Sequence, residues 1–499
     1  IIYSVGQLFY TYLEEDNNTL SEGVLQPYYE KKFFTYNNGT WSPRDPSGVS
    51  FAEDSISVIN GDVVIDKDTY CSSLTIDSGA SVTVLNSKSI TVNDEITLNS
   101  SSTSFSSLIG DVNGTMSYNR YTSQIDSKGG VNDLISAPVE NLSFATFANQ
   151  NSGKLVESGS LRSFGDYNTT TDKYEPFDIN TDSHRQLELG KGYIAATEKG
   201  SELKFTGEVS NNDVNVTMSD DGLAWNLIGN PYASYINFKL FYDENKNKFD
   251  DHYQAIYGYN GTTDLWTIWN KLTPQDSKIA PGQAFFVKAK TATTAVKFTP
   301  SMQTIGKTDD FILNKQAKTD FVMCNLYLSR ENDTVATKIY FIEDSTRGLD
   351  PGYDAAVNDS GDFSNLLLFT SLVSDSENSE MAIQSLPCDD LNNVVVPLGI
   401  KAELAELTIG INDNTTTLPS NIHVYLEDRI ASAFTLLNSS NYTFTPTGDL
   451  QGSDQFFLHF SSIPLTTENI SFRNIEIYNR AASKEIIIKG VLGLNTKVL

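Results

Sequence analysis

A short pattern, in which a threonine stands between two apolar residues, recurs in one part of the chain. Its copies are Leu74-Thr75-Ile76, Val82-Thr83-Val84, Ile90-Thr91-Val92 and Ile96-Thr97-Leu98. Successive side chains of a β-strand point to opposite faces, so each copy can bury its two apolar side chains and expose its threonine. A unit this short cannot bury its own apolar face, so neighbouring copies must stack. The pattern predicts a small β-helix-like ladder over residues 51–110, with Cys71 facing its core.

The rest of the chain also has the sequence pattern of strands. Alternating β-branched and aromatic residues, bounded by Gly, Asn, Asp and Ser, occur for example at residues 338–342, 422–426 and 456–460. The best helical periodicity, at residues 400–407, is too short to carry a domain. We therefore predict an all-β, multidomain fold.

Changes in composition divide the chain into six segments. They are a strand unit at 1–35, a Gly/Pro/Ser/Asn-rich linker at 36–50, the short β-repeat at 51–110, an aromatic-rich β domain at 111–304, a β-sandwich at 305–463 and an incomplete domain at 464–499. The last segment stops in what reads as the middle of a strand, and one strand pair is marginally stable alone. We expect it to be the start of a small domain.

The overall charge restricts the partners. The chain has 35 Lys and Arg against 63 Asp and Glu, a formal net charge of −28. Such a field repels phosphate backbones and anionic lipids, so nucleic acid is excluded as an expected partner. No apolar run reaches the ~18 residues of a transmembrane helix. The chain begins at Ile1 rather than Met, which suggests that a signal peptide has already been removed.

No catalytic residue can be nominated. The chain has no G-x-S-x-G elbow, no H-E-x-x-H and no P-loop, and its four histidines are far apart in sequence. No carboxylate pair stands out from the many acidic residues, as a glycosidase would require. We therefore predict that the protein is not an enzyme.

One segment has the spacing of a calcium loop. Its candidate ligands are Asp243, Asn245, Asn247 and Asp251, whose oxygen atoms suit a hard cation. The interspersed lysines, and the lack of a glycine at the sharp turn, favour a solvated polar loop as the alternative. Apart from Ca²⁺ here, no cofactor is predicted. The aspartates 350, 354, 359 and 362 form a similar cluster, which turns containing Pro-Gly and Ser-Gly explain equally well.

The three cysteines permit one disulfide. Cys324 and Cys388 are the better pair because both fall in the predicted 305–463 domain. Three buried free thiols are the more common outcome for such residues, since free cysteine behaves as a small hydrophobe.

Several aromatic residues are candidates for stacking on sugars. Trp266 and Trp269 are three residues apart, so on a strand they point to opposite faces and cannot form one platform. Trp225 stands in an apolar run and is predicted to be core. His423 shares a strand face with Tyr425 and Glu427, which more often indicates a structural hydrogen bond than a catalytic pair.

Several motifs resemble those of secreted and cell-surface proteins of Bacteroidetes that the type IX secretion system exports. The motifs are Ser4-Val-Gly-Gln7 with Glu22-Gly-Val-Leu-Gln-Pro-Tyr28, Leu74-Thr-Ile-Asp-Ser-Gly-Ala80, Trp225-Asn-Leu-Ile-Gly-Asn-Pro-Tyr232, Ile279-Ala-Pro-Gly-Gln-Ala-Phe-Phe-Val287, Leu386-Pro387, Val396-Pro-Leu-Gly399 and Val424-Tyr-Leu-Glu-Asp428. The tail resembles the first strands of the Ig-like type A C-terminal sorting domain. Its matching residues are Ile475, Ile477, Tyr478, Ile487, Lys489 and Gly490. The later strand of that domain, with its Gly-Arg turn and Lys-rich end, is absent.

The resemblance implies an extracellular or cell-surface location. The implied partners are the secretion translocon and an outer-membrane shuttle protein. Proteins of this class carry O-glycans at Asp-Ser/Thr-aliphatic motifs, which makes Ser55 and Thr334 candidate attachment sites. A non-enzymatic adhesion or surface-interaction role is the first hypothesis.

Two alternatives remain open: a glycan-binding module associated with polysaccharide degradation, and a structural stalk. Surface glycans are the expected partner under the first alternative. Several exposed aromatic residues on one face of the 111–300 region would favour it, whereas dispersed buried aromatics would contradict it.

Overall fold

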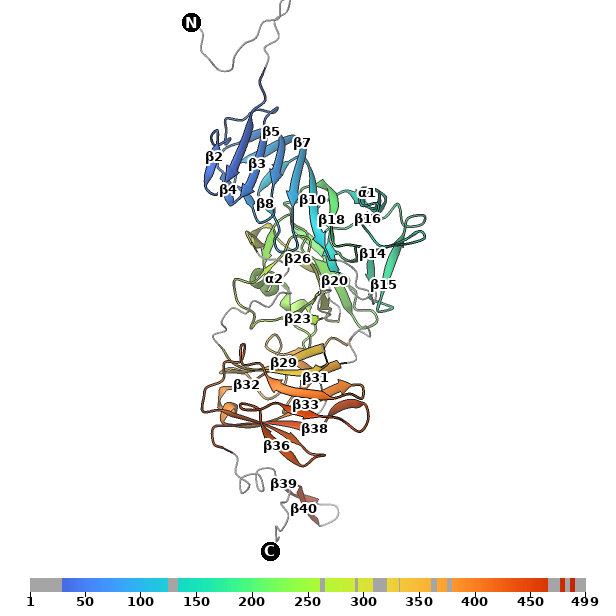
Figure 1. Ribbon diagram of the computed structural model, residues 1–499, viewed down its shortest axis with the longest axis vertical. Coiled ribbons are helices and arrows are strands. Elements are labelled where there is room, and N and C mark those ends of the chain that lie inside the picture. Colours follow the sequence, from blue (N-terminus) through green and yellow to red (C-terminus); the bar gives the residue numbers. More distant parts are fainter. Residues whose placement is uncertain are drawn as a thin grey trace, which may run out of the picture. The chain divides into compact units, whose positions relative to one another are not determined.

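The computed structural model describes much of the chain (Figure 1). The described residues are 29–123, 133–260, 265–291, 295–307, 321–331, 333–359, 366–374, 379–464, 476–480 and 485–489. The prediction of an all-β, multidomain fold is confirmed: β-strands dominate every part of the described chain.

Two compact units divide the molecule. Unit 1 comprises Ile1–Phe249, Ile256–Trp269 and Gln275–Asn314, and unit 2 comprises Asp250–Ala255, Asn270–Pro274 and Lys315–Leu499. Two short segments of the predicted 111–304 domain therefore belong to unit 2. The predicted β-repeat and the aromatic-rich segment lie together in unit 1.

Unit 1 begins with a β-solenoid, as the threonine-centred pattern predicts. Its strands are β1 (Phe33–Asn37), β3 (Ser55–Asn60), β4 (Asp62–Ile65), β5 (Thr69–Ile76), β6 (Ser81–Val84), β7 (Ser89–Asn99), β8 (Ser107–Ile109), β9 (Asp111–Asn113) and β10 (Thr115–Thr122). Strands β1, β3, β5, β7 and β10 pair in parallel in one sheet, and β4, β6 and β8 pair in parallel in a second.

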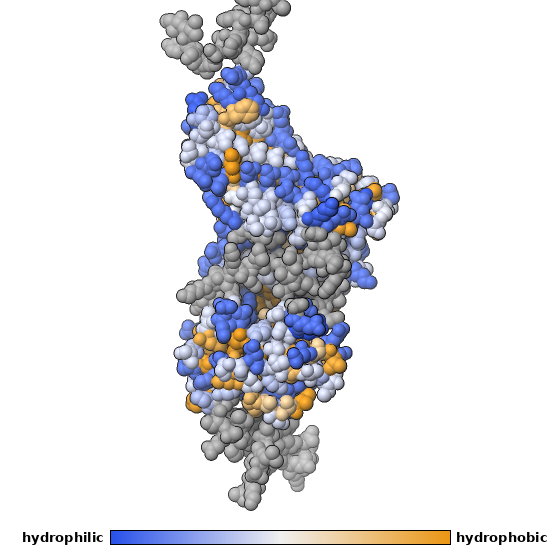
Figure 2. Space-filling model, in the orientation of Figure 1, coloured by the Kyte–Doolittle hydropathy of each residue, from blue (hydrophilic) through white to orange (hydrophobic). Residues whose placement is uncertain are grey.

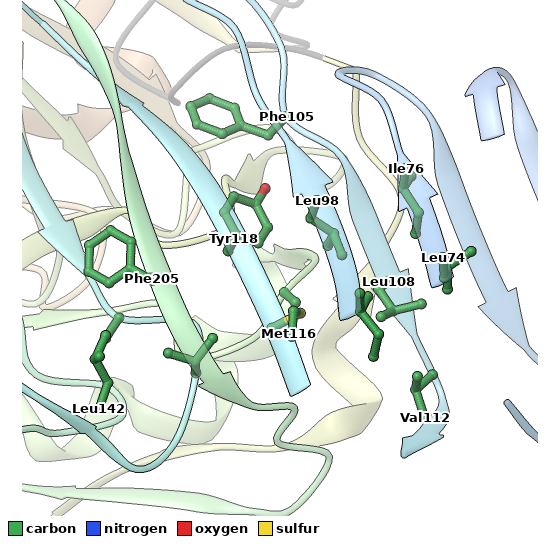
Figure 3. Packing of buried hydrophobic residues seen from close by; sticks show 14 of the residues in the cluster. Leu74, Ile76, Leu98, Phe105, Leu108, Val112, Met116, Tyr118, Leu142 and Phe205 are labelled. Atoms are coloured by element: carbon green, nitrogen blue, oxygen red, sulfur yellow. The ribbon is translucent and has the colours of Figure 1, made fainter. Parts of the chain in front are cut away.

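The register of these strands places apolar residues of one strand opposite apolar residues of the next. Ile76 of β5 lies opposite Leu98 of β7, which lies opposite Tyr118 of β10, and Figure 3 shows these side chains within the core. The apolar members of all four copies are buried and the threonines between them are half-buried. Cys71 is fully buried, as predicted.

Part of the predicted linker is a hairpin. Strand β2 (Thr40–Ser42) pairs antiparallel with β1 through Asn38 and Gly39, both of which have positive φ. Asn-Gly is the favoured pair for such a two-residue turn because the turn requires positive φ at both positions.

The outer surface of the solenoid is mostly hydrophilic, with isolated apolar residues (Figure 2).

After the solenoid, unit 1 contains the same arrangement of elements twice. The first repeat runs from β10 through β11 (Asp133–Ser136), β12 (Leu142–Ser143), α1 (Phe144–Gln150), β13 (Glu157–Ser158), β14 (Leu161–Asn168), β15 (Lys173–Asp178), β16 (Gln186–Leu187) and β17 (Gly192–Ala195) to β18 (Ser201–Glu208). The second repeat runs from β19 (Val214–Thr217) through β20 (Trp225–Gly229), β21 (Tyr235–Asn237), α2 (Phe238–Asn245), β22 (Ile256–Asn260), β23 (Leu265–Trp269), β24 (Lys278–Ile279) and β25 (Ala284–Lys288) to β26 (Ala295–Phe298).

The strand pairing of the two repeats is equivalent. The first has the order β11-β17-β14 with β15 beside β14, and the second has the order β20-β25-β22-β23. Strand β10 pairs with β18 as β19 pairs with β26, and β12 pairs with β16 as β21 pairs with β24. The sequences also correspond, for example Leu134-Ile-Ser-Ala-Pro138 with Leu227-Ile-Gly-Asn-Pro231. We conclude that the second repeat is an internal duplication of the first.

An asparagine at the end of each helix joins it to a strand. The Asn151 side-chain amide donates to the carbonyl of Lys204 at 2.9 Å, and its oxygen accepts from the Lys204 N–H at 2.7 Å. Asn245 makes the same two contacts with Lys297, each at 2.8 Å. Each asparagine thus bonds a strand backbone as a neighbouring strand would.

Unit 2 is a β-structure around one apolar core. Its strands are β28 (Val322–Arg330), β29 (Asp333–Ile342), β30 (Ala355–Ala356), β31 (Leu366–Ser371), β32 (Glu380–Pro387), β33 (Asn393–Ala402), β34 (Leu407–Ile411), β35 (His423–Asp428), β36 (Ala433–Leu436), β37 (Tyr442–Phe444) and β38 (Leu450–Ser461). They pair in the order β36-β35-β38-β33-β31-β32-β29-β28-β34-β37, with β30 beside β32. Their inward side chains alternate with outward ones and form one cluster.

The remaining elements are short. They are β27 (Gln303–Thr304), the 3₁₀ turns at Lys246–Lys248, Pro300–Met302 and Cys388–Asn392, and an antiparallel hairpin of β39 (Glu476–Arg480) with β40 (Glu485–Lys489). Among the residues that the structure describes, no helix is long and apolar enough to cross a membrane.

Candidate functional site

The proposed calcium loop is helical, so the loop interpretation is wrong. Asp243 and Asn245 lie in α2, and Asn247 lies in the 3₁₀ turn that follows. The Asp243 carboxylate pairs with Lys239 and Lys246, and the buried Asn245 holds β26. Asp251, in contrast, belongs to unit 2. Asp243 and Asn245 are therefore already engaged by neighbouring residues, and Ca²⁺ binding itself stays a prediction.

The second acidic cluster contains a turn. The N–H of Asp354 donates to the carbonyl of Asp350, and the Asp354 carboxylate is fully buried. Asp359 accepts a hydrogen bond from the Tyr253 hydroxyl at 3.1 Å, and Asp362 lies outside the described residues. Within the described ranges, no three His, Cys, Asp or Glu side chains are placed to hold a metal ion.

The candidate glycosylation sites have different surroundings. Ser55 begins β3, and its hydroxyl lies 2.8 Å from that of Ser73 on the next strand of the solenoid. Thr334 is exposed near the turn between β28 and β29. Both assignments stay predictions.

The candidate sorting residues lie partly in the terminal hairpin. Ile477 and Tyr478 belong to β39, and Ile487 and Lys489 belong to β40, with Tyr478 opposite Ile487. Ile475 and Gly490 lie outside the described residues.

The structure has no Cys324–Cys388 disulfide. Cys324 is buried in the core of unit 2, whereas Cys388 is exposed at the start of a 3₁₀ turn. The expectation of three buried thiols is therefore correct for Cys71 and Cys324 and wrong for Cys388.

The tryptophans divide between core and surface as the strand period requires. Trp225 is fully buried. Trp269 packs against Phe238 of α2, with ring centroids 5.3 Å apart. Trp266 points to the opposite face of the β20-β25-β22-β23 sheet, which bears a different group of aromatic residues.

That group consists of two equivalent aromatic pairs. In the first repeat, Tyr167 of β14 lies opposite Tyr174 of β15, and their ring centroids are 5.4 Å apart. In the second repeat, Tyr259 of β22 lies opposite Trp266 of β23, with centroids 5.2 Å apart. All four rings are half-buried. The duplication has thus placed a cross-strand aromatic pair on each of two hairpins.

Phe286 of β25 joins the two pairs. Its ring centroid is 4.8 Å from that of Tyr167, 6.3 Å from that of Tyr174 and 5.9 Å from that of Trp266. Phe286 itself is 2% exposed. Because a buried ring supports the outer rings from below, they form one continuous aromatic surface, which we call the twin-hairpin surface (Tyr167, Tyr174, Tyr259, Trp266 and Phe286).

Polar side chains border the first hairpin. The Asn168 amide donates to Glu175 Oε1 at 2.6 Å, and the Tyr167 hydroxyl donates to Asp172. Aromatic faces with a few placed hydrogen-bonding groups are suited to a ligand that has both apolar C–H faces and hydroxyls. This is the chemistry of a sugar ring.

Sequence reasoning missed this surface because it treated each tryptophan alone. The signal was present in the sequence: Tyr167-Asn168 and Tyr259-Asn260 are each followed seven residues after the tyrosine by a second aromatic residue, Tyr174 and Trp266. Recognising the duplication would have aligned them.

Comparison with curated proteins and with solved structures finds no match to this chain. A family model described as "Domain of unknown function (DUF8693)" matches residues 35–460, from the first strand of the solenoid to the last long strand of unit 2. The chain therefore belongs to this family of unknown function.

Proposed function

We propose that the protein is a non-enzymatic, extracellular adhesion protein that holds glycans on the twin-hairpin surface. The observation that carries the proposal is the pair of equivalent, half-buried aromatic pairs on adjoining hairpins. Each pair offers a ring face to the C–H face of a sugar. Two such pairs beside each other suit consecutive sugars of a chain better than a single monosaccharide.

The cellular side of the proposal rests on the sequence resemblance. The protein is a cargo of the type IX secretion system, its terminal hairpin is part of the sorting signal, and its partners in export are the translocon and the shuttle protein. The large negative net charge keeps such a protein soluble outside the cell. Thr334, which is exposed, is the more accessible of the two candidate glycosylation sites.

A glycan array tests the binding role with the full chain. We expect binding to a subset of oligosaccharides, and roughly 5-fold weaker binding for Trp266→Ala or Tyr174→Ala, since an aromatic contact contributes about 1 kcal/mol. Tyr70→Ala is the matched control, because Tyr70 is an exposed aromatic residue on the solenoid. If the wild-type chain binds no glycan, or if Tyr70→Ala weakens binding as much, the proposal is wrong.

Mass spectrometry of protein from its native cells tests the export role. A mass above 55.1 kDa that falls on deglycosylation, with peptides modified at Thr334 or Ser55, supports an exported glycoprotein. An unmodified chain recovered from the cytoplasmic fraction contradicts it.

A further inference from the structure

A second polar and aromatic surface lies on the outward face of unit 2. On strands β36, β35 and β38, the residues that alternate with the buried core residues face outward. Strand pairing places Phe434, Glu427 and Phe457 in one row across the three strands. The next row contains Leu436, Tyr425 and His459. Phe434 and His459 are in contact, with ring centroids 5.4 Å apart.

Glu427 organises the centre of this face. Its side chain is 8% exposed and accepts a hydrogen bond from His459 Nε2 at 2.8 Å. The sequence placed Glu427 with His423 of its own strand, but the histidine that Glu427 bonds is His459 of the neighbouring strand. Burial acts to raise the pKa of Glu427, and the contacts with His459 and Arg429 outweigh it and hold the pKa below its usual value. The carboxylate therefore remains ionised.

Arg429 is held flat against the same face. Its guanidinium carbon lies 3.4 Å from the ring centroid of Phe457, and its Nε lies 3.5 Å from Glu427 Oε1. The side chain is 40% exposed, and its two Nη groups have no hydrogen-bond partner among the described residues. A stacked guanidinium with a free Nη edge has the geometry that binds a carboxylate through two parallel hydrogen bonds.

Both carboxylates of this part of unit 2 are engaged with neighbouring side chains. Glu427 is compensated by Arg429 and His459, and the neighbouring Asp428 is buried and accepts hydrogen bonds from Tyr442 and Gln455. The Nη edge of Arg429 is then the exposed cationic group of this face.

We propose that this face of unit 2 binds a carboxylate-bearing sugar, with the carboxylate on the Nη edge of Arg429 and the sugar ring against the outward aromatic residues. Glu427 is a positioning residue, since it orients Arg429 and His459. The site is separate from the twin-hairpin surface and does not depend on glycan binding there.

Isothermal titration calorimetry of the full chain, with trigalacturonate and with its methyl ester, tests the proposal. The two probes differ in charge and share the sugar chain. At neutral pH and physiological salt we expect trigalacturonate to bind about 10-fold more tightly, because a charge-assisted bidentate contact is lost in the ester. Equal affinity for acid and ester, or binding to neither, overturns the proposal.

Variants locate the site. Arg429→Gln should abolish the preference for the acid, whereas Arg330→Gln, a change at a partly buried arginine elsewhere in unit 2, should keep it. Trp266→Ala should also keep the preference, which separates this site from the twin-hairpin surface. A preference that survives Arg429→Gln, or a triglutamate peptide that binds as tightly as trigalacturonate, contradicts a sugar-acid site at Arg429.

Discussion

Asp354 receives two hydrogen bonds from Ser385: its Oδ1 accepts from the Ser385 N–H at 2.6 Å and from the Ser385 hydroxyl at 2.8 Å. Its other oxygen accepts from the N–H of Asp350 at 2.7 Å. A fully buried carboxylate thereby fastens the turn at residues 350–354 to strand β32. The arrangement satisfies the carboxylate geometrically but leaves its charge in an apolar environment.

The stability of unit 2 should therefore depend on pH through Asp354. Burial raises the pKa of Asp354 to about 7, whereas the pKa of an aspartate in an unfolded chain is about 3.9. The protonated form is favoured in the folded state, so the stabilisation from this group is complete below about pH 4 and is lost as the pH rises to about 7. Chemical denaturation across this range should show it. Asp354→Asn should flatten that part of the curve; an unchanged curve would contradict the assignment.

Ser385→Ala serves as the companion variant for Asp354. The hydroxyl hydrogen bond lowers the pKa of Asp354 against the larger effect of burial. Removing it should move the loss of stability to higher pH, while the carboxylate and the backbone contacts remain.

The solenoid should tolerate changes on its outer face and not on its inner face. Ile96 is fully buried, so Ile96→Ala leaves a cavity and should lower the free energy of unfolding by about 2–4 kcal/mol. Thr97, next to it, is half-buried, and Thr97→Ala should cost less than about 1 kcal/mol. Hydrogen exchange of peptides from β5 and β7 measures the destabilisation that each of the two variants causes. Similar costs for the two variants would contradict the inward and outward assignment.

Replacing the buried amide of Gln384 should raise stability, whereas replacing that of Asn230 should lower it. Neither Gln384 Nε2 nor Oε1 has a hydrogen-bond partner in the part of the chain that the structure describes. Gln384 lies opposite Ile339 of the unit 2 core. Because an unpaired buried amide costs about 1–3 kcal/mol, Gln384→Met should stabilise unit 2 by about 1 kcal/mol.

Asn230 is the contrasting case. Its amide donates to the carbonyls of Ser234 and Ala280, and its oxygen accepts from the N–H of Tyr232. Asn230→Leu should destabilise unit 1 by about 2–4 kcal/mol, since it leaves these backbone groups unpaired. Thermal unfolding of Gln384→Met, Asn230→Leu and the wild-type protein measures whether each replacement raises or lowers stability.

The cysteines should react in two stages. Cys388 is exposed, whereas Cys71 and Cys324 are buried, and burial raises the pKa of the Cys71 thiol to about 12. A thiol reagent should modify Cys388 in the native protein and the other two only after denaturation, because the thiolate is the reactive form. Mass spectrometry of the labelled peptides identifies the sites. Resistance of Cys388 under native conditions would contradict its exposure.

The sequence predicts those features that depend on neighbours along the chain. The apolar-threonine-apolar pattern predicts the solenoid because the two-residue strand period alone decides which side chain is inward, as at Leu74 and Thr75. The position of Trp225 in the core follows from its apolar neighbours in the same way.

The loop conformation was predicted wrongly at residues 243–247 because one residue pattern has two interpretations. Asp243 is four residues after Lys239 and three before Lys246, which is also the spacing of ion pairs on a helix. Alternation of polar residues alone does not distinguish a ligand loop from such a helix. The side chain of Asn245, a predicted ligand, makes two hydrogen bonds with the backbone of Lys297. Sequence spacing does not reveal this contact.

The candidate surfaces depend on contacts between distant segments. Tyr174 and Phe286 are far apart in sequence, and only the packing of one repeat on the other brings them together. Arg429 and Phe457 likewise meet through the pairing of β35 with β38. A single sequence gives the residue types of such surfaces but not the strand register that assembles them.

The asparagines at the ends of α1 and α2 bear on how a duplicated fold avoids misassembly. A strand edge with free N–H and C=O groups can pair with any similar strand, and two copies of one topology in the same chain supply such strands. Asn151 and Asn245 occupy the backbone groups of Lys204 and Lys297 from within their own repeat. In each repeat, therefore, an asparagine side chain occupies the strand edge that could otherwise pair with the equivalent strand of the other repeat. Duplication of the segment also duplicated this safeguard against exchange of strands between repeats.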